Sequence, residues 1–364
     1  MKIVVDKDEL INALELIGKI SFKHETLPIL QCVLISSDKN GVKLQATNLE
    51  IGMEVIVAGK IDDNGTVAVP AQTLLKTVQY TLDKDISLYL DNGVLHLETR
   101  STKTSINTFP TEDFPRLTKL TGESVRLNGK GFVSGVKNVS FAASVTSIKP
   151  ELGSVYIQQK HEHTLTMVST DSFRLMEKTV SQENMQIKTP FMLPYRNALE
   201  LARVCEKIGE NPEMIITEEQ CALSFSAGVY IYSRLVVGDF PDYEQIIPKE
   251  FVCRVKVLKS DLLRALKKTN IFLNQFKQVT FKVTKEGLTI RAQSDEIGSI
   301  TDFVKAESEG GEVVLNFNHL YLSEGLGYFS DDTLMLSFAG LGRALVITGN
   351  SDKNTRYLVM PMNR

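Results

Sequence analysis

The sequence repeats one pattern three times, and this repetition constrains the fold more than any other feature. A strand-like run followed by a helix-like run begins near residues 3, 125 and 255, so the copies are offset by 122 and then 130 residues. Apolar residues recur at the same positions of each copy: Ile3, Val125 and Val255; Val5, Leu127 and Val257; Leu10, Phe132 and Leu262; Leu14, Val136 and Leu266. A period this long indicates duplicated domains rather than the stacked hairpins of a solenoid.

The repeat also predicts the number of domains. A chain of 364 residues suits two or three domains, and copies of about 120 residues favour three, each large enough to bury its own core. We predict domains at residues 1–120, 121–249 and 250–364. The register recurs inside each copy: Thr47-Asn48, Thr170-Asp171 and Ser294-Asp295 follow a strand-like run, and Pro70, Pro194 and Asn316 end a strand before a helix-like stretch.

The composition favours a cytoplasmic globular protein. The chain is 43% hydrophobic and 23% charged, with a net charge of −3. No run of apolar residues is long enough to span a membrane, and the N-terminus lacks the apolar core of a signal peptide. The four cysteines show no paired spacing, so we expect neither a disulfide framework nor a metal site, and no cofactor.

Within each copy, strand-like runs are separated by turns rather than by helices, which predicts antiparallel sheets and the α+β class. Turn residues occur at Asp38-Lys39-Asn40-Gly41, Asp91-Asn92-Gly93, His161-Glu162-His163 and Lys285-Glu286-Gly287. Two short amphipathic helices per copy are expected, at residues 8–19, 71–80, 129–140, 195–207, 260–269 and 317–328. In the fifth helix, Leu262, Leu263, Ala265 and Leu266 share one face, and Ser260 or Asp261 is the expected N-cap.

These six helices differ in charge from the rest of the chain. They carry ten basic and seven acidic residues, a net charge of +3 against −3 for the whole chain. Such a chain would repel nucleic acid over most of its surface and tolerate it along the helices. For any single helix, a solvated face over a core face is a sufficient explanation.

Three further segments identify a family. They are Thr26-Leu27-Pro28-Ile29-Leu30; the pair formed by residues 169–175 and 238–243; and Tyr357-Leu358-Val359-Met360-Pro361-Met362. In this order and with the threefold repeat, the chain closely resembles the bacterial β sliding clamps, the processivity subunits of the replicative DNA polymerase. The resemblance covers the whole length.

This resemblance implies a fold and a function. Clamps of this family are head-to-tail homodimers of three tandem clamp domains per chain, with antiparallel sheets outside and helices inside a ring. The ring encircles double-stranded DNA without reading its sequence. It tethers the replicative DNA polymerase, the clamp loader and other proteins with a clamp-binding motif, and it is not an enzyme. No membrane contact is implied.

The resemblance places DNA contacts on basic residues of the helices and nearby loops: His24, Lys130, Lys137, Lys149, Arg196, Arg203, Lys207, Arg264, Lys267 and Lys268. Sequence-independent phosphate contacts of this kind suit a sliding ring. His24 and Gln72 stand where arginine is frequent in the family, and the first helix is acidic. We therefore expect the second and third copies to dominate DNA contact.

The resemblance also implies a pocket for partner peptides between the second and third domains. Its residues are Leu152, Thr170, Ser172, Phe173, Arg174, Leu175, Pro241, Ile246, Tyr321, Ala344, Val359, Met360, Pro361 and Met362. Methionine is adaptable and suits a surface that accepts several partners. Phe173, Ser172 and Gln245 stand where His, Gly and a basic residue are frequent, which would shift the preferred peptide.

Ring closure is expected to join the first domain of one subunit to the third domain of the other. By resemblance, Ile271 and Phe272 would meet Thr104 and Ile106, with the sheets continuing across the joint. The alternative is that Ile271 and Phe272 belong to the core of their own domain.

Two other classes of function remain as alternatives. An enzyme would need a phosphate loop, a nucleophile or a metal site, and the only hint is His161-Glu162-His163, which suits a solvated turn better. A scaffold that docks peptides without encircling DNA is the second. Retention on nicked circular DNA that is lost on linearisation would separate the readings.

Overall fold

A computed structural model describes residues 1–21, 27–39, 41–146, 148–183, 187 and 189–362. The chain forms two compact units, residues 1–130 with 200–235 and residues 131–199 with 236–364. The middle copy of the repeat is divided between the units. Some of its strands extend a sheet of the first copy and the others extend a sheet of the third.

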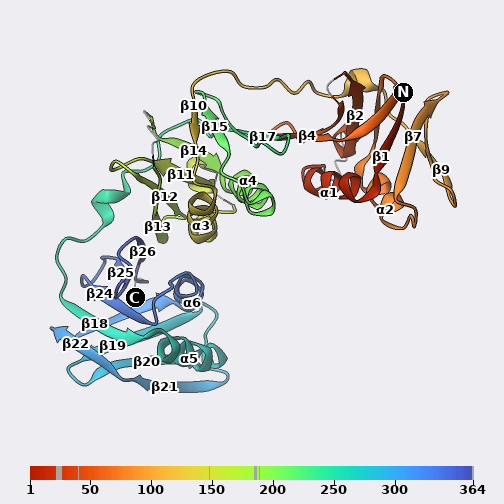
Figure 1. Cartoon of the computed structure of the whole chain (residues 1–364). Coiled ribbons are helices and arrows are strands. Elements are labelled where there is room, and N and C mark those ends of the chain that lie inside the picture. The colour runs from red at the N-terminus through yellow and green to blue at the C-terminus, as the bar shows by residue number, and fades with distance from the viewer. Residues whose placement is uncertain (22–26, 40, 147, 184–186, 188, 363–364) are drawn as a thin grey trace. The chain divides into compact units, whose positions relative to one another are not determined.

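The first copy begins with β1 and ends with β9 (Figure 1). Its strands are β1 (Lys2–Asp6), β2 (Cys32–Asp38), β3 (Gly41–Thr47), β4 (Ile51–Val57), β5 (Gly59–Asp63), β6 (Gly65–Pro70), β7 (Asp85–Asp91), β8 (Val94–Glu98) and β9 (Lys103–Asn107). Its helices are α1 (Lys7–Ile17) and α2 (Ala71–Gln79), with the short 3₁₀ turns η1 (Pro28–Gln31) and η2 (Thr111–Asp113).

The second copy follows the same order. Its strands are β10 (Ser124–Arg126), β11 (Ser154–Gln158), β12 (Thr164–Thr170), β13 (Arg174–Ser181), β14 (Phe191–Pro194), β15 (Glu213–Ile216), β16 (Gln220–Ser224) and β17 (Val229–Arg234). Its helices are α3 (Gly129–Val139) and α4 (Tyr195–Ile208), with η3 (Ser140–Ala142) and η4 (Pro150–Gly153). A connecting segment with η5 (Tyr243–Ile246) leads into the third copy.

The third copy repeats the pattern once more. Its strands are β18 (Cys253–Leu258), β19 (Gln278–Thr284), β20 (Gly287–Ser294), β21 (Gly298–Val304), β22 (Ala306–Gly310), β23 (Val313–Asn318), β24 (Thr333–Phe338), β25 (Leu345–Gly349) and β26 (Thr355–Val359). Its helices are α5 (Lys259–Thr269) and α6 (His319–Leu326), with η6 (Asn270–Phe272).

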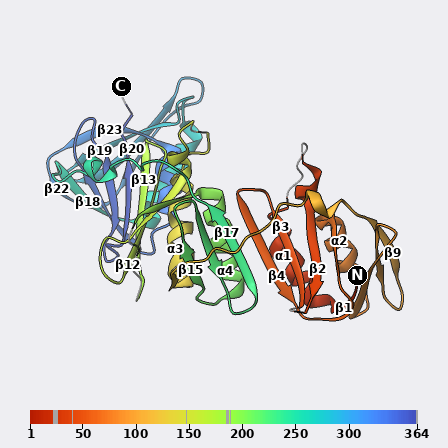
Figure 2. The same ribbon diagram turned by 90° about the horizontal axis from the view of Figure 1, so that it is seen from above.

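Two sheets form the first unit. One has the order β5-β1-β7-β8-β9, and the other has the order β10-β15-β16-β17-β4-β3-β2-β6. The second sheet therefore joins the first copy to the middle copy, through the pairing of β4 with β17. Helices α1 and α2 pack against each other and against strands of both sheets (Figure 2).

The second unit repeats this design. One sheet has the order β14-β11-β12-β13-β26-β25-β24-β18-β22, and the other has the order β21-β20-β19-β23. The larger sheet joins the middle copy to the third copy, through the pairing of β13 with β26. Helix α5 packs on β18, β20, β21 and α6, so the helices of this copy also cover one side of its sheets (Figure 1).

The predicted α+β class and antiparallel sheets are confirmed. Every named strand pairing among the described residues is antiparallel. The predicted turn after β7 has φ of +49° at Asn92 and +76° at Gly93, as a two-residue type I′ hairpin requires. Asn40, in the predicted turn after β2, lies outside the described residues.

The predicted helices are confirmed to within one or two residues at most ends, but two details were wrong. Strand β23 continues past Asn316 to Asn318, whose side chain accepts the N–H of Leu320 at 2.9 Å and caps α6. The N-cap of α5 is Leu258, without a side-chain hydrogen bond, because the helix begins at Lys259, one residue before the predicted start. Asp261 instead lies in the first turn and pairs with Arg264.

The core lies between the sheets and the helices. In α5, Leu262, Ala265 and Leu266 are buried, whereas Leu263 is half-buried. Strand β2 alternates buried and half-buried residues, which is the period expected of a strand with one face on the core. Burying one leucine contributes about 1.5–3 kcal/mol, so the repeated apolar positions hold each copy together.

Candidate functional site

The observed helices are more basic than the sequence estimate. Within the described residues, six α-helices carry eleven basic and seven acidic residues, a net charge of +4. The basic residues are Lys7, Lys76, Lys130, Lys137, Arg196, Arg203, Lys207, Lys259, Arg264, Lys267 and Lys268. The acidic residues are Asp8, Glu9, Glu15, Glu200, Glu206, Asp261 and Glu324. By copy, the helices carry −1, +3 and +2, so the positive charge is concentrated in the second and third copies.

Two positions of the first copy, His24 and Gln72, depart from the arginine that is frequent in the family. His24, predicted to contact DNA, lies outside the described residues. Gln72 donates from its side-chain amide to the carbonyl of Gly18 at 3.2 Å. This bond ties the start of α2 to the end of α1, so Gln72 has a structural role that is independent of DNA.

Two of the residues predicted to contact DNA hold helices α1 and α4 together. Arg203 is paired with Glu200, and it also donates to the carbonyl of Leu16 at 2.8 Å. Lys207 lies 3.0 Å from the carboxylate of Glu15. Arg203 is largely buried, with 21% of its side chain exposed. It therefore fixes α4 to α1 and is poorly placed to reach a phosphate.

The remaining predicted cations lie at the surface. Arg264 pairs with Asp261 at 2.8 Å and keeps 67% of its side chain exposed, and Lys268 pairs with Asp302 at 3.0 Å. Arg196 donates to the Tyr195 hydroxyl at 3.0 Å. Exposed pairs of this kind are weak, so these side chains can turn towards a ligand. Four further exposed lysines are Lys130, Lys137, Lys149 and Lys267.

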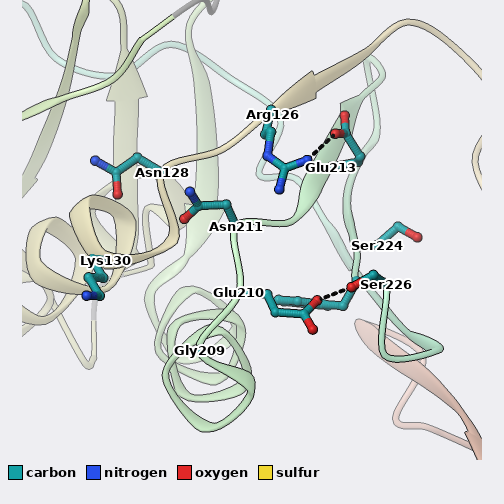
Figure 3. A pocket seen from close by; sticks show the side chains of 10 residues that line it. Arg126, Asn128, Lys130, Gly209, Glu210, Asn211, Glu213, Ser224 and Ser226 are labelled. Carbon is teal, nitrogen blue, oxygen red and sulfur yellow. Dashed lines mark hydrogen bonds and ion pairs between the residues drawn. The ribbon is translucent and has the colours of Figure 1, made fainter.

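Lys130 also lines a hollow of about 710 Å³ in the first unit (Figure 3). Its other lining residues are Arg126, Asn128, Gly209, Glu210, Asn211, Glu213, Ser224, Phe225 and Ser226. The lining carries both positive and negative side chains. Arg126 lies 3.8 Å from Glu213, and the Ser226 hydroxyl donates to Glu210 at 2.5 Å. The lining therefore carries two basic and two acidic side chains.

The predicted peptide site lies in the second unit, where β13 and β26 pair. Arg174 is opposite Val359 and Leu175 is opposite Leu358. The backbone N–H of Met360 donates to the carbonyl of Phe173 at 2.8 Å. Residues from the second and third copies are therefore brought side by side, as the sequence predicts.

A tight turn between β12 and β13 orients Phe173 and Arg174. The Thr170 hydroxyl donates to the carbonyl of Arg174 at 2.7 Å. Asp171 Oδ1 accepts the backbone N–H groups of Phe173 and Arg174 at 3.0 and 2.9 Å. Asp171 thus fixes the backbone of this turn, in which Ser172 has φ of +77°.

The first copy contains the same turn. Thr47 donates to the carbonyl of Ile51 at 3.0 Å, and Asn48 accepts the N–H groups of Glu50 and Ile51. Leu49 has φ of +77°, equal to the value at Ser172. The first and second copies therefore share this turn, and in the second copy it also carries the predicted site.

Arg174 is held by several partners at once. It donates to Asp171 at 2.9 Å, to Glu324 and to the carbonyl of Phe141 at 3.0 Å, and it lies 4.6 Å from the ring centre of Tyr321. Burial opposes its charge, but the bond with Glu324 and the nearby acidic groups outweigh burial and raise the pKa of Arg174. Its head is therefore a fixed part of this region.

A hydrophobic cluster lies beside this arginine. Its buried members are Val168, Leu175, Tyr243, Ala344, Val346 and Leu358, and Tyr156, Phe240, Ile247, Phe251 and Met360 pack against it. Tyr243 belongs to η5 in the connecting segment. Burial and the charge of Glu177 raise the pKa of Tyr243, and its hydroxyl donates to Glu177 at 2.7 Å. The segment is thereby fixed against the sheet.

The predicted peptide residues divide into two groups. Thr170, Leu175, Ala344 and Val359 are buried, so their side chains support the site from below. The others are exposed or half-exposed, and Phe173 and Ile246 are 60% and 50% exposed. We call the following residues the apolar surface: Phe173, Pro241, Ile246, Tyr321, Met360, Pro361 and Met362. Leu152 lies in η4, which packs on β12, and Ser172 is exposed in the turn.

Sequence reasoning missed several residues of this region. Phe240 stacks on Tyr156 at 4.6 Å, and Lys160 bridges Glu177 and Glu244 at 2.9 and 2.7 Å. Phe240 could have been recognised as the apolar neighbour of Pro241. Nothing in the linear sequence brings Lys160 to Glu177, because they meet only across strands β11 to β13.

The predicted joint residues lie at sheet edges. Thr104 and Ile106 are on β9, which ends the sheet of the first copy, whereas η6 with Ile271 lies next to β21. Ile271 is 63% exposed, which argues against the core alternative. The side chain of Ile106 is 5% exposed and belongs to the core of its own copy, because it faces Leu95 on β8. Phe272 is half-buried.

Other chemistry is scarce in the part of the chain that the structure describes. There, no group of His, Cys, Asp and Glu could hold a metal ion, and no helix is long and apolar enough to cross a membrane. All four cysteines are buried and free, and burial raises the pKa of Cys205 and Cys221 to about 12. His161 and His163 lie in a turn, as predicted.

Comparison with known proteins identifies the family. Residues 1–118 match the DNA polymerase III beta subunit N-terminal domain, residues 126–242 the central domain, and residues 244–363 the C-terminal domain. These matches cover nearly the whole chain. The chain belongs to the DNA polymerase III beta subunit family, the β sliding clamps. Its function is that of a DNA sliding clamp, the processivity factor of a replicative polymerase.

Individual relatives are distant but of equal length. The beta sliding clamp of Pseudomonas putida is 26% identical over 378 residues, with both chains fully covered. The solved DNA polymerase III beta subunit of Thermotoga maritima is 24% identical, with a TM-score of 0.93 and coverage of 100% and 99%. The Pseudomonas aeruginosa subunit is 22% identical, with a TM-score of 0.94 and full coverage of both chains. The three-domain clamp fold is thus shared at low identity.

Proposed function

We propose that two copies of the chain close head to tail into a ring that encircles duplex DNA and holds the replicative polymerase on it. Strand pairing across copies carries this proposal: β4 pairs with β17, and β13 pairs with β26. In the part of the chain that the structure describes, their counterparts β21 and β9 have no such partner, because each ends its sheet. Pairing of β9 with β21 of a second copy would remove both open edges, and two such joints would close a ring.

The internal pairings supply the register of the proposed joint. Pairings that start at Ile3, Val125 and Val255 lead through the strands to Thr104, Ile231 and Tyr357. Ile231 lies opposite Met53, and Tyr357 lies opposite Met176. The residue at the matching position of β21 is Ile300, six residues after Ser294. The proposed joint therefore places Thr104 opposite Ile300 and Ser105 opposite Ser299.

Apolar contacts at the second internal joint predict those between subunits. Phe141 stacks on Tyr328 with ring centres 4.4 Å apart and lies 5.6 Å from Tyr357. The repeat register makes Ile271 the counterpart of Phe141. Aligning the observed N-caps of α2 and α6, Pro70 and Asn318, makes Tyr80 the counterpart of Tyr328. Tyr80 is 86% exposed and Ile271 is 63% exposed, so their contact in the dimer would cover two of the larger exposed side chains.

DNA contact rests on the basic helices. Lysine and arginine attract phosphates without reading sequence, and a topological tether needs only weak attraction. The helix charges favour the second and third copies for this role. Exposed cations such as Lys130, Arg196 and Lys267 suit it best, whereas Arg203 is better placed to hold α4 to α1.

The apolar surface is proposed to hold a short peptide of the polymerase, of the clamp loader or of another partner. Its exposed aromatic and methionine side chains can adapt to several sequences, and β13 and β26 give it a rigid support. In this proposed role, the chain supplies no catalytic residue and works in the cytoplasm. The proposed domain limits stay at residues 120 and 249, within the connecting segments.

Light scattering tests the ring. The wild-type chain should have the mass of a dimer, and Ile271→Ala combined with Phe272→Ala should have the mass of a monomer, because the joint loses its exposed apolar contacts. Val314→Ala, at an exposed site on β23, is the matched control and should remain a dimer. A wild-type monomer at micromolar concentration would overturn the proposed ring.

A further inference from the structure

The segment that borders the apolar surface is acidic. From Val237 to Glu250, both included, it carries four acidic residues and one basic residue, Lys249. We call Asp239, Asp242, Glu244 and Glu324 the acidic rim. Asp239 and Asp242 are exposed, and the side chains of Glu244 and Glu324 are 61% and 39% exposed. Because η5 carries Tyr243 into the hydrophobic cluster, this part of the rim is fixed beside the apolar surface.

The cations of the same region are already shared between carboxylates. Arg174 bonds to both Asp171 and Glu324. Lys160 bonds to both Glu177 and Glu244, and Glu177 also accepts from Arg356 at 3.2 Å. Neither Arg174 nor Lys160 is available to attract an acidic ligand without breaking buried or half-buried bonds.

The remaining polar contacts leave the rim negative. Asp242 accepts a hydrogen bond from the uncharged Gln245 at 2.7 Å. Along residues 237–250 the single cation is the exposed Lys249, against the exposed Asp239, Asp242, Glu244 and Glu250. A ligand that approaches the apolar surface therefore meets a net negative border. Charges at the border of a site influence partner choice and association rate more than total affinity.

We propose that the apolar surface selects partner peptides whose apolar residues are flanked by lysine or arginine, and disfavours peptides flanked by aspartate or glutamate. This inference rests on the proposed peptide-binding function of the same surface. The apolar residues of the peptide cover Phe173, Ile246 and Met362, and its basic flank lies along Asp242 and Glu244. Gly238, with φ of +130°, and Pro241 shape the exposed backbone ahead of η5.

Fluorescence anisotropy with three labelled peptides tests this selection. All share one apolar half of leucine and phenylalanine, and their other half carries two lysines, two glutamines or two aspartates. The lysine peptide should bind about tenfold more tightly than the aspartate peptide at low salt, since each exposed pair contributes a few-fold. The ratio should fall towards about twofold between about 50 and 300 mM NaCl, because salt screens exposed charges.

Two double variants locate the charges. Asp242→Asn with Glu244→Gln should reduce the preference for lysine over aspartate to about twofold or less. Glu286→Gln with Glu309→Gln removes the same charge at exposed positions in the turn after β19 and on β22 and should keep the full preference. Thermal unfolding checks that both variants are folded. Equal binding of all three peptides by the wild type, or an unchanged preference in the first variant, would overturn the charge selection while peptide binding stands.

A separate variant tests the site itself. Met362→Ala should weaken binding of all three peptides by a similar factor, because it removes apolar contact area and no charge. If none of the peptides binds, or if Met362→Ala leaves every affinity unchanged, the proposed peptide site is wrong, and the charge selection falls with it. The two failures are therefore distinguishable.

Discussion

Ser172 is held in a backbone conformation that suits glycine. Its φ is +77°, and Asp171 fixes the turn by accepting the backbone N–H groups of Phe173 and Arg174. A left-handed conformation costs a residue with a side chain about 1 kcal/mol or more. Glycine is frequent at this position in the family, and this chain has serine. The structure shows that the turn keeps its shape with serine, so the serine lowers the stability of the folded chain.

Ser172→Gly should therefore stabilise the chain. We expect the free energy of unfolding to rise by about 0.5–1 kcal/mol, because strain in the folded state outweighs the added freedom of glycine in the unfolded chain. Urea unfolding followed by circular dichroism would measure it. Ser308→Gly, on the extended strand β22, is the control and should lower the stability. A loss of stability in Ser172→Gly would contradict the strain account.

Residue exposure was the least predictable property of the site. The pattern of strands and helices follows from local periodicity, so it could be read from the sequence. Whether a given side chain is exposed depends on packing between distant segments. Ile106 lies on the edge strand β9, yet its side chain faces Leu95 in its own core, and Arg203 binds α1.

Each strand joint inside the chain contains a buried glutamate that is paired with a lysine. Glu54 on β4 and Glu177 on β13 are equivalent in the repeat, and both are buried. Glu54 lies 2.7 Å from Lys119, and Glu177 lies 2.9 Å from Lys160. The equivalent residue of β21 is Thr301, so the proposed joint between subunits lacks this buried carboxylate. The ring is expected to open there.

A half-buried pair at the joint of β13 and β26, formed by Lys178 and Asp352, makes the stability of the chain depend on pH. Asp352 accepts from Lys178 at 3.0 Å, from Thr355 at 2.8 Å and from the N–H of Asn354 at 2.8 Å. Burial would raise the pKa of Asp352, but these bonds outweigh burial and lower it. A lowered pKa means that its stabilisation is complete above the unfolded pKa and is lost as the pH falls through the folded pKa.

Asp352→Asn should therefore cost stability at neutral pH but not in acid. We expect a loss of about 1–2 kcal/mol at neutral pH, and the difference from wild type should shrink between about pH 5 and about pH 3. Urea titrations across this range would measure it. Asp91→Asn, at an exposed hairpin, should change little at any pH. A difference that stays constant with pH would rule out the paired carboxylate as its cause.

At the scale of the element, the sequence was most informative where chemistry is local. Helix ends were predicted closely because apolar positions recur at helical spacing, but the caps of α5 and α6 depend on the last residues of β18 and β23. The peptide site could be placed only by resemblance. Its supports, such as Lys160 and Phe240, come together through the pairing of β11, β12 and β13 and have no local signal.

At the scale of the molecule, the threefold repeat links the fold to the proposed ring. Two joints of the same kind lie inside the chain, and the third pair of strands, β9 and β21, is left at sheet edges. The unpaired edges of β9 and β21 thus correspond to the edges that are paired inside the chain, β17 with β4 and β26 with β13. In the proposed ring, a second copy gives β9 and β21 the cross-copy pairing that β4 with β17 and β13 with β26 have inside the chain.

Cysteine pairs test the register of that joint. Directly opposite residues in antiparallel strands have Cα atoms about 4.5–5.5 Å apart, which is within reach of a disulfide. Ser105→Cys with Ser299→Cys should give covalent dimers on oxidation, seen on non-reducing gels. Ser105→Cys with Thr301→Cys, displaced by two residues on the same face, should cross-link far less. Equal yields from both pairs would contradict the register.

The encircling of DNA is tested most directly by topology. The variant with Ser105→Cys and Ser299→Cys is mixed with nicked circular duplex, oxidised, and passed over a gel-filtration column at about 1 M NaCl, where phosphate contacts are screened. The account predicts that the covalent ring elutes with the circle and is released when the circle is cut once. Equal retention on linear and circular DNA, or release from both, would contradict it.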